Sequence, residues 1–152
     1  MKRKNNGFFI DYELYRSNAF KDLKPISVWV LLEFFTKRQL KKNSSGCWAC
    51  INNGKIIFPY REAKNKLGLH SAQFTRAIDN LMEVGFIDLT HSGNGSGSQK
   101  DPSLYAISER WRKYGTSDFE KHEREKEDRK LGFQGNKKKA ANSNIIDLAS
   151  RK

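Results

Sequence analysis

Cysteine is scarce in this chain, which contains only Cys47 and Cys50 among 152 residues. Their spacing is compatible with a zinc or redox site, but they fall in a predicted strand, where residues three apart point to opposite faces about 10 Å from each other. That separation is too large for a disulfide or a shared tetrahedral metal ion. No second cysteine pair exists, and the three histidines are scattered. We therefore expect reduced thiols, no metal site and no cofactor.

Long apolar runs are also missing. The longest run, from Ile26 to Phe35, contains Glu33 and is about half the length that a bilayer crossing requires. The basic start of the chain is not followed by a secretory apolar region, because Phe8-Phe9-Ile10 gives way at once to Asp11. We therefore expect no membrane segment and a cytoplasmic location.

Acidic residues are in the minority, at 17 against 29 basic residues, so the net charge is +12. Such an excess favours a nucleic-acid partner. Residues 1–118 hold 19 basic and 11 acidic residues, a net of +8, and residues 119–152 hold 10 and 6, a net of +4. The positive charge is therefore not confined to the C-terminal end. A hydrophobic content of 37%, with ten Phe, is sufficient for the core of one domain.

A central helix is predicted from Pro25 or Ser27 onward, where proline suits the first turn. After it, Asn53-Gly54 predicts a two-residue turn that joins a strand at 48–51 to a strand at 55–58. The apolar residues of the helix form an almost continuous surface, which predicts the centre of the core: Ile26, Trp29, Val30, Leu31, Phe34 and Phe35.

Two short amphipathic segments meet at a glycine within residues 58–86. Ala63 and Leu67 share one face of the first segment, which Gly68 is expected to end. Ser71 is expected to cap the second segment, which ends at Gly85. The apolar residues of this second segment recur at the spacing of one buried helical face: Phe74, Ala77, Ile78 and Leu81.

The opposite face of the second segment is polar. Gln73, Arg76 and Asn80 lie along one edge of it, and side chains of these types read base edges or contact phosphates. The pattern predicts a helix-turn-helix whose second helix enters the DNA major groove, with an ordinary helical hairpin as the alternative. DNA binding requires that this face be free of the chain's own tail and not ringed by acidic groups.

A second hairpin is predicted directly after Gly85, with strands at 86–90 and 104–107 and a polar loop at 91–101. The GNGSGS of this loop is not a phosphate-binding loop, because no Gly-Lys-Ser/Thr and no helix follow it. Ser108 is expected to cap a short helix that closes the domain through Trp111 and Tyr114. The WRKYG run in this helix is not a plant WRKY signature, since the zinc ligands of that family are missing.

The run from Ile56 to Tyr114 resembles winged helix-turn-helix proteins of bacterial phages and mobile elements, some of which are similar to the DNA-binding domains of plasmid replication initiators. The resemblance is carried by FPY, EA, LG, the F-x-x-A-I-x-x-L spacing, GFI and RWRKYG, and it covers roughly residues 8 to 119. It implies an α+β, mainly helical fold, with a β-hairpin before the helix-turn-helix and a wing after it. It also implies duplex DNA binding, with Ser71, Gln73, Arg76 and Asn80 on the reading helix.

We therefore predict a basic arm at 1–7, a winged helix-turn-helix domain at 8–118 and a charged helical or disordered tail at 119–152. The predicted function is non-enzymatic binding of double-stranded DNA by a transcriptional regulator of a phage or mobile element. A replication-initiation protein and a protein-interaction module are the alternatives, while homodimerisation and a protein partner for the tail stay open. The predicted DNA contacts are Ser71, Gln73, Thr75, Arg76, Asn80, Lys64, Lys66 and Lys100.

Overall fold

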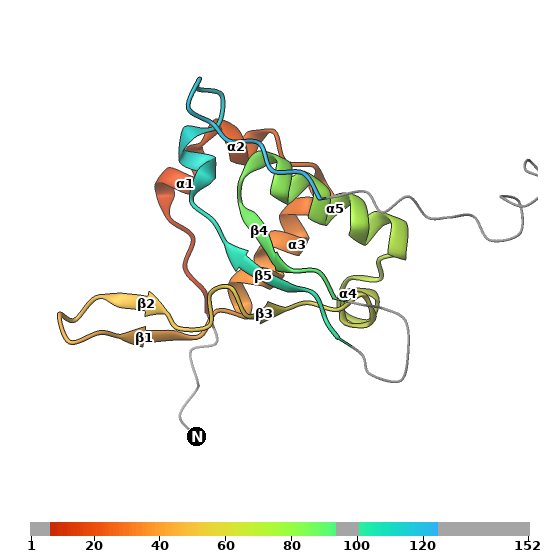
Figure 1. Ribbon diagram of the computed structural model, residues 1–152, viewed down its shortest axis with the longest axis horizontal. Helices are drawn as coiled ribbons and strands as arrows, with labels where there is room; N and C mark the ends of the chain where they lie inside the picture. Colours follow the sequence, from red (N-terminus) through yellow and green to blue (C-terminus); the bar gives the residue numbers. More distant parts are fainter. Residues whose placement is uncertain (1–6, 94–100, 125–152) are drawn as a thin grey trace, which may run out of the picture.

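A computed structural model describes residues 7–93 and 101–124, which have an α+β architecture (Figure 1). The strands form two antiparallel sheets, one of order β1-β2 and one of order β3-β5-β4. The helices are α1 (Tyr12–Arg16), α2 (Asn18–Lys21), α3 (Pro25–Thr36), α4 (Tyr60–Leu67), α5 (Ser71–Val84) and the 3-10 helix η1 (Arg110–Lys113). The strands are β1 (Leu40–Lys42), β2 (Trp48–Cys50), β3 (Ile56–Ile57), β4 (Ile87–His91) and β5 (Leu104–Ile107).

Helix α3 is the centre of the core, as predicted, and proline lies in its first turn. Phe34 is fully buried and packs edge-on against Phe58 and Tyr105, with ring centroids 5.4 and 5.3 Å away. Phe58 in turn meets Phe74 of α5 at 5.2 Å. The expectation that Trp29 belongs to this core is wrong, since its side chain is 62% exposed.

The β-hairpin that precedes α4 is built from other strands than predicted. Strand β2 pairs with β1, with Lys42 opposite Trp48, and β3 pairs with β5 instead. Gly54 has the positive φ that the turn signal implies, at 84°. The neighbouring Asn53 side chain, however, binds both the N–H and the C=O of Ile107 in β5. The turn is therefore tied to a distant strand, because a turn signal does not specify which strands pair.

Helices α4 and α5 and the glycine between them are confirmed. Gly68 ends α4 with a left-handed backbone, φ +65°, and Gly85 ends α5 in the same way, φ +94°. A Cβ on Gly85 would lie 2.8 Å from the backbone nitrogen of Trp111, so only glycine fits there without a backbone shift. This close approach places η1 against the C-terminal end of α5.

The hairpin after Gly85 is also confirmed, since β4 and β5 pair with Ile87 opposite Ile107. At the base of its loop the His91 ring nitrogen Nε2 lies 2.6 Å from Asp101 Oδ2. In the described ranges, no helix has both the length and the apolar character that a membrane crossing requires.

Candidate nucleic-acid interface

Helix α5 turns its apolar stripe to the core, as predicted, because Phe74, Ala77, Ile78 and Leu81 are all buried. The residue at the N-cap is His70 and not Ser71, which is the first residue of the helix. The backbone N–H of His70 donates to Gln73 Oε1 at 3.0 Å. The side-chain oxygen of Gln73 is therefore already occupied by a hydrogen bond at the start of α5.

The first half of α5 has an outer face that no described segment covers. Ser71, Ala72 and Arg76 are exposed, and Gln73 and Thr75 are half-buried. Arg76 makes no hydrogen bond or ion pair with any residue of 7–93 or 101–124. A guanidinium without an internal partner is available to a phosphate or a base edge.

Asn80 is not part of this face, and its prediction as a DNA contact is wrong. Its side chain is only 7% exposed, and its Oδ1 accepts a hydrogen bond from the backbone N–H of Lys24 at 3.1 Å. Lys24 is the residue that precedes α3. Asn80 therefore joins α5 to the start of α3 inside the fold.

The two predicted lysines of α4 have different surroundings. Lys64 is exposed and makes no ion pair in the part of the chain that the structure describes. Lys66 lies 2.8 Å from Glu62 and 3.0 Å from Glu33, and these hydrogen bonds raise the pKa of the Lys66 ammonium. Lys66 therefore links α4 to α3, so we leave it out of the candidate interface although it was predicted to hold the DNA backbone.

Arg61 is a cation that the sequence prediction did not assign to the interface. It is exposed and, within the described ranges, unpaired. Arg61 and Lys64 are three apart on α4, so they share one face of that helix. This spacing is visible in the sequence, whereas the difference between Lys64 and Lys66 depends on Glu33 in another helix.

Lys100, the predicted contact of the wing loop, lies outside the described residues.

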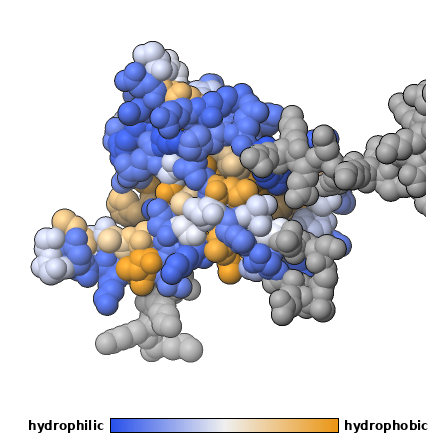
Figure 2. Space-filling view, in the orientation of Figure 1, coloured by the Kyte–Doolittle hydropathy of each residue, from blue (hydrophilic) through white to orange (hydrophobic). Residues whose placement is uncertain are grey.

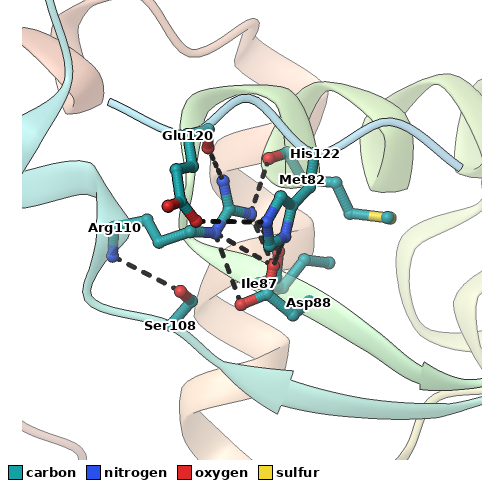
Figure 3. Close-up of polar contacts among 7 residues, drawn as sticks. All are labelled: Met82, Ile87, Asp88, Ser108, Arg110, Glu120 and His122. Atoms are coloured by element: carbon teal, nitrogen blue, oxygen red, sulfur yellow. Dashed lines mark hydrogen bonds and ion pairs between the residues drawn. The ribbon is translucent and has the colours of Figure 1, made fainter. Parts of the chain in front are cut away.

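The second half of α5 has a different neighbour, the segment of residues 119–124, which we call the docked segment. Figure 3 shows how Arg110 holds it: the guanidinium donates to the Glu120 carbonyl at 2.6 Å and to the carbonyl of Met82 at 3.0 Å. The same guanidinium pairs with Asp88 at 2.5 Å. The His122 ring nitrogen Nδ1 lies 2.8 Å from the same carboxylate.

Asp88 is the centre of this arrangement. Burial alone would raise the pKa of its carboxyl, but hydrogen bonds from Arg110, His122 and Ser108 outweigh burial and hold the pKa below its ordinary value. A carboxylate that stays charged stabilises the cations around it. Asp88 thus helps to fix the start of the segment that was predicted to be a charged helical or disordered tail.

The docked segment reaches the outer face of α5 through two ion pairs. Lys121 Nζ lies 2.9 Å from Glu83 Oε1, and Arg124 Nη2 lies 2.7 Å from Asp79 Oδ1. Within residues 7–93 and 101–124, no segment of the chain covers the first half of α5, whereas the docked segment covers part of the second half. We accordingly restrict the candidate interface to Ser71, Gln73, Thr75, Arg76, Arg61 and Lys64.

No protein-family model matches this chain, and no curated protein or solved structure matches it. Cys47 and Cys50 are both free thiols. Among the described residues, no three His, Cys, Asp or Glu side chains gather in a way that could hold a metal ion.

Proposed function

We propose that this chain is a winged helix-turn-helix protein that binds duplex DNA without catalysing a reaction. The order of elements supports the fold: α3, β3, α4, α5 and then the β4–β5 hairpin, with β3 paired to β5. A helix pair with a tight glycine turn followed directly by a hairpin is the layout of a winged helix. The second helix of that layout is α5.

The observation that carries the DNA-binding proposal is Arg76, which is exposed on the first half of α5 and has no partner among the residues that the structure describes. Most other arginines of the described ranges have an acidic or backbone partner, for example Arg110 and Arg112. The positive charge of residues 1–118, a net of +8, supports the same partner. DNA supplies both the phosphates and the base-edge acceptors that a free guanidinium binds.

Each residue of the interface has a distinct role in this proposal. Arg76 reaches a base edge or a phosphate in the major groove, and the amide nitrogen of Gln73 donates beside it. Ser71 presents the N–H groups at the start of α5 to a phosphate. Arg61 and Lys64 bind the DNA backbone and carry no sequence information. Thr75 lies half-buried at the edge of this set.

Regulation of transcription in a phage or mobile element, in the cytoplasm, is the role we propose for this binding. A replication-initiation protein would use the same surface. Mapping the bound sequence separates these roles, since a regulator binds at a promoter and an initiator binds at a replication origin.

The test is binding of the full chain to a mixed-sequence duplex across a salt series. Each phosphate neutralised should contribute a slope of about −0.9 to the logarithm of affinity against the logarithm of salt concentration. Arg76→Glu should lower affinity at least about tenfold, or about 1.4 kcal/mol. Lys41→Glu is the matched control, because Lys41 lies in the β1–β2 hairpin that projects away from α5 (Figure 1). A flat salt response, or equal effects of both variants, contradicts the proposal.

A protein-interaction module is the second candidate, and the β1–β2 hairpin favours it. Leu40, Trp48 and Ile51 are exposed on or beside this hairpin. Figure 2 shows hydrophobic colour, mixed with hydrophilic colour, on this hairpin and across the middle and lower part of the body, whereas the upper part of the same face is mostly hydrophilic. This candidate predicts that Arg76→Glu leaves DNA affinity unchanged, while Trp48→Ala weakens binding of a saturable protein partner.

A further inference from the structure

The outer face of α5 carries two carboxylates beside the proposed DNA-reading arginine. Asp79 follows Arg76 by three residues, and Glu83 follows Asp79 by four, so all three share one face of the helix. Side chains at this spacing are neighbours, and an acid three residues from an arginine forms an ion pair with it readily. An Arg76 engaged with Asp79 would be partly neutralised and turned away from DNA.

The structure contains no such pair, and the Asp79 carboxylate has another partner. Its Oδ1 is covered from solvent, accepts no hydrogen bond within the described residues, and lies 2.7 Å from Arg124 Nη2. The Asp79 side chain as a whole is 47% exposed, so a nearby countercharge stabilises its carboxylate modestly. Arg124 supplies this countercharge. Arg76, which lies one turn away from Asp79 on α5, is the other cation that could supply it.

The position of Arg124 is set by several contacts besides its own ion pair. Arg110 binds the Glu120 carbonyl at 2.6 Å, and the Phe119 ring packs edge-on against Tyr114 with centroids 5.2 Å apart. Lys121 pairs with Glu83 one helical turn further along α5. An isolated surface ion pair is weak, but these anchors hold the docked segment where its last residue meets Asp79.

We propose that Arg124 is a positioning residue of the DNA interface, which occupies the Asp79 carboxylate and so leaves the Arg76 guanidinium free for DNA. The inference rests on the proposed function, since it assigns a role to Arg124 only through Arg76. It also gives a reason for an acidic residue on the helix that binds DNA: Asp79 fixes the docked segment to α5.

The experiment is a double-mutant cycle on the full chain, with affinity for a mixed-sequence duplex at low salt as the readout. Arg124→Gln should lower affinity about two- to fivefold, the size of one exposed ion pair, because Asp79 then captures Arg76. In an Asp79→Asn background the same Arg124→Gln change should have no effect. Arg124→Lys, which keeps the charge, should retain most of the affinity. Thermal unfolding of each variant shows whether the fold is intact.

Four other outcomes overturn the inference. Higher affinity of Arg124→Gln would mean that the docked segment obstructs DNA. An equal loss in the Asp79→Asn background would mean that Arg124 contacts phosphate directly. No change in Arg124→Gln, with a large loss in Arg76→Glu, removes the role of Arg124 and keeps the proposed function. No loss in Arg76→Glu removes the proposed function itself.

Discussion

Asn80 Oδ1 accepts a hydrogen bond from the backbone N–H of Lys24 at 3.1 Å, although the two residues are 56 positions apart in the sequence. Lys24 is the N-cap of α3, and its N–H lies outside the hydrogen-bond pattern of that helix. The Asn80 amide therefore fixes the start of the core helix to the middle of α5. A polar residue on α5 is in this case part of the fold and not of the candidate interface.

Replacing Asn80 with alanine should destabilise the protein without weakening DNA binding directly. The Lys24 N–H loses its partner at a partly buried junction, which costs about 1 kcal/mol. Chemical denaturation measures this loss, and DNA affinity measured well below the unfolding transition should stay within about twofold of the original, less than 0.5 kcal/mol. Arg76→Ala is the reciprocal control, with unchanged stability and weaker DNA binding. A loss of affinity in Asn80→Ala at full folding would return Asn80 to the interface.

The elements that could be predicted from the sequence are those with a local cause. The apolar spacing from Phe74 to Leu81 defines the buried face of α5, and Gly68 and Gly85 mark where α4 and α5 end. Proline at the first turn of α3 is likewise a local signal, since it marks where that helix begins. Each of these signals lies within a few residues of the element that it specifies.

The features that could not be predicted depend on partners far away in the sequence. Asn80 has the polarity and spacing of an outer-face residue, and only the approach of Lys24 makes it a buried one. The Asn53-Gly54 turn is real, but Asn53 pairs with Ile107 and so redirects β3 to β5. Residues 120–124 contain no apolar residue, and ion pairs with Asp79, Glu83 and Asp88 hold them to the body of the protein.

Gly85→Ala should be much more damaging than Gly68→Ala, although both glycines end a helix with a positive φ. The left-handed backbone costs an alanine about 1 to 2 kcal/mol at either position. At Gly85 the new Cβ also meets the Trp111 backbone nitrogen at 2.8 Å, whereas nothing lies within 4 Å of Gly68. Overpacking adds about 1 to 3 kcal/mol. Equal free energies of unfolding for the two variants would contradict the close approach of η1 to α5.

Asp88 should make stability depend on pH in the acid range. Because its folded pKa is lowered, its contribution is fully present above the ordinary value of 3.8 and is lost as pH falls through the folded value. Asp88→Asn should reduce this acid-range loss and cost about 1 to 3 kcal/mol at neutral pH, since charged hydrogen bonds from Arg110 are removed. Urea unfolding at a series of pH values measures both effects. Asp118→Asn, at an exposed aspartate, is the control and should change neutral-pH stability by less than about 0.5 kcal/mol.

Substitutions of Lys64 and Lys66 can be compared to distinguish a lysine that contacts DNA from a lysine that forms an internal ion pair. Both are exposed lysines of α4, but only Lys66 is paired with Glu33 and Glu62. Lys64→Gln should weaken DNA binding and reduce the salt slope by about 0.9, the contribution of one phosphate. Lys66→Gln should leave the salt slope unchanged and cost less than about 1 kcal/mol of stability, as expected for a solvent-exposed pair. Salt titrations of both variants against the same duplex, with urea unfolding alongside, make the comparison. If Lys66→Gln reduces the slope as much as Lys64→Gln does, the ion pairs of Lys66 yield to DNA and the interface extends along α4 toward its C-terminal end.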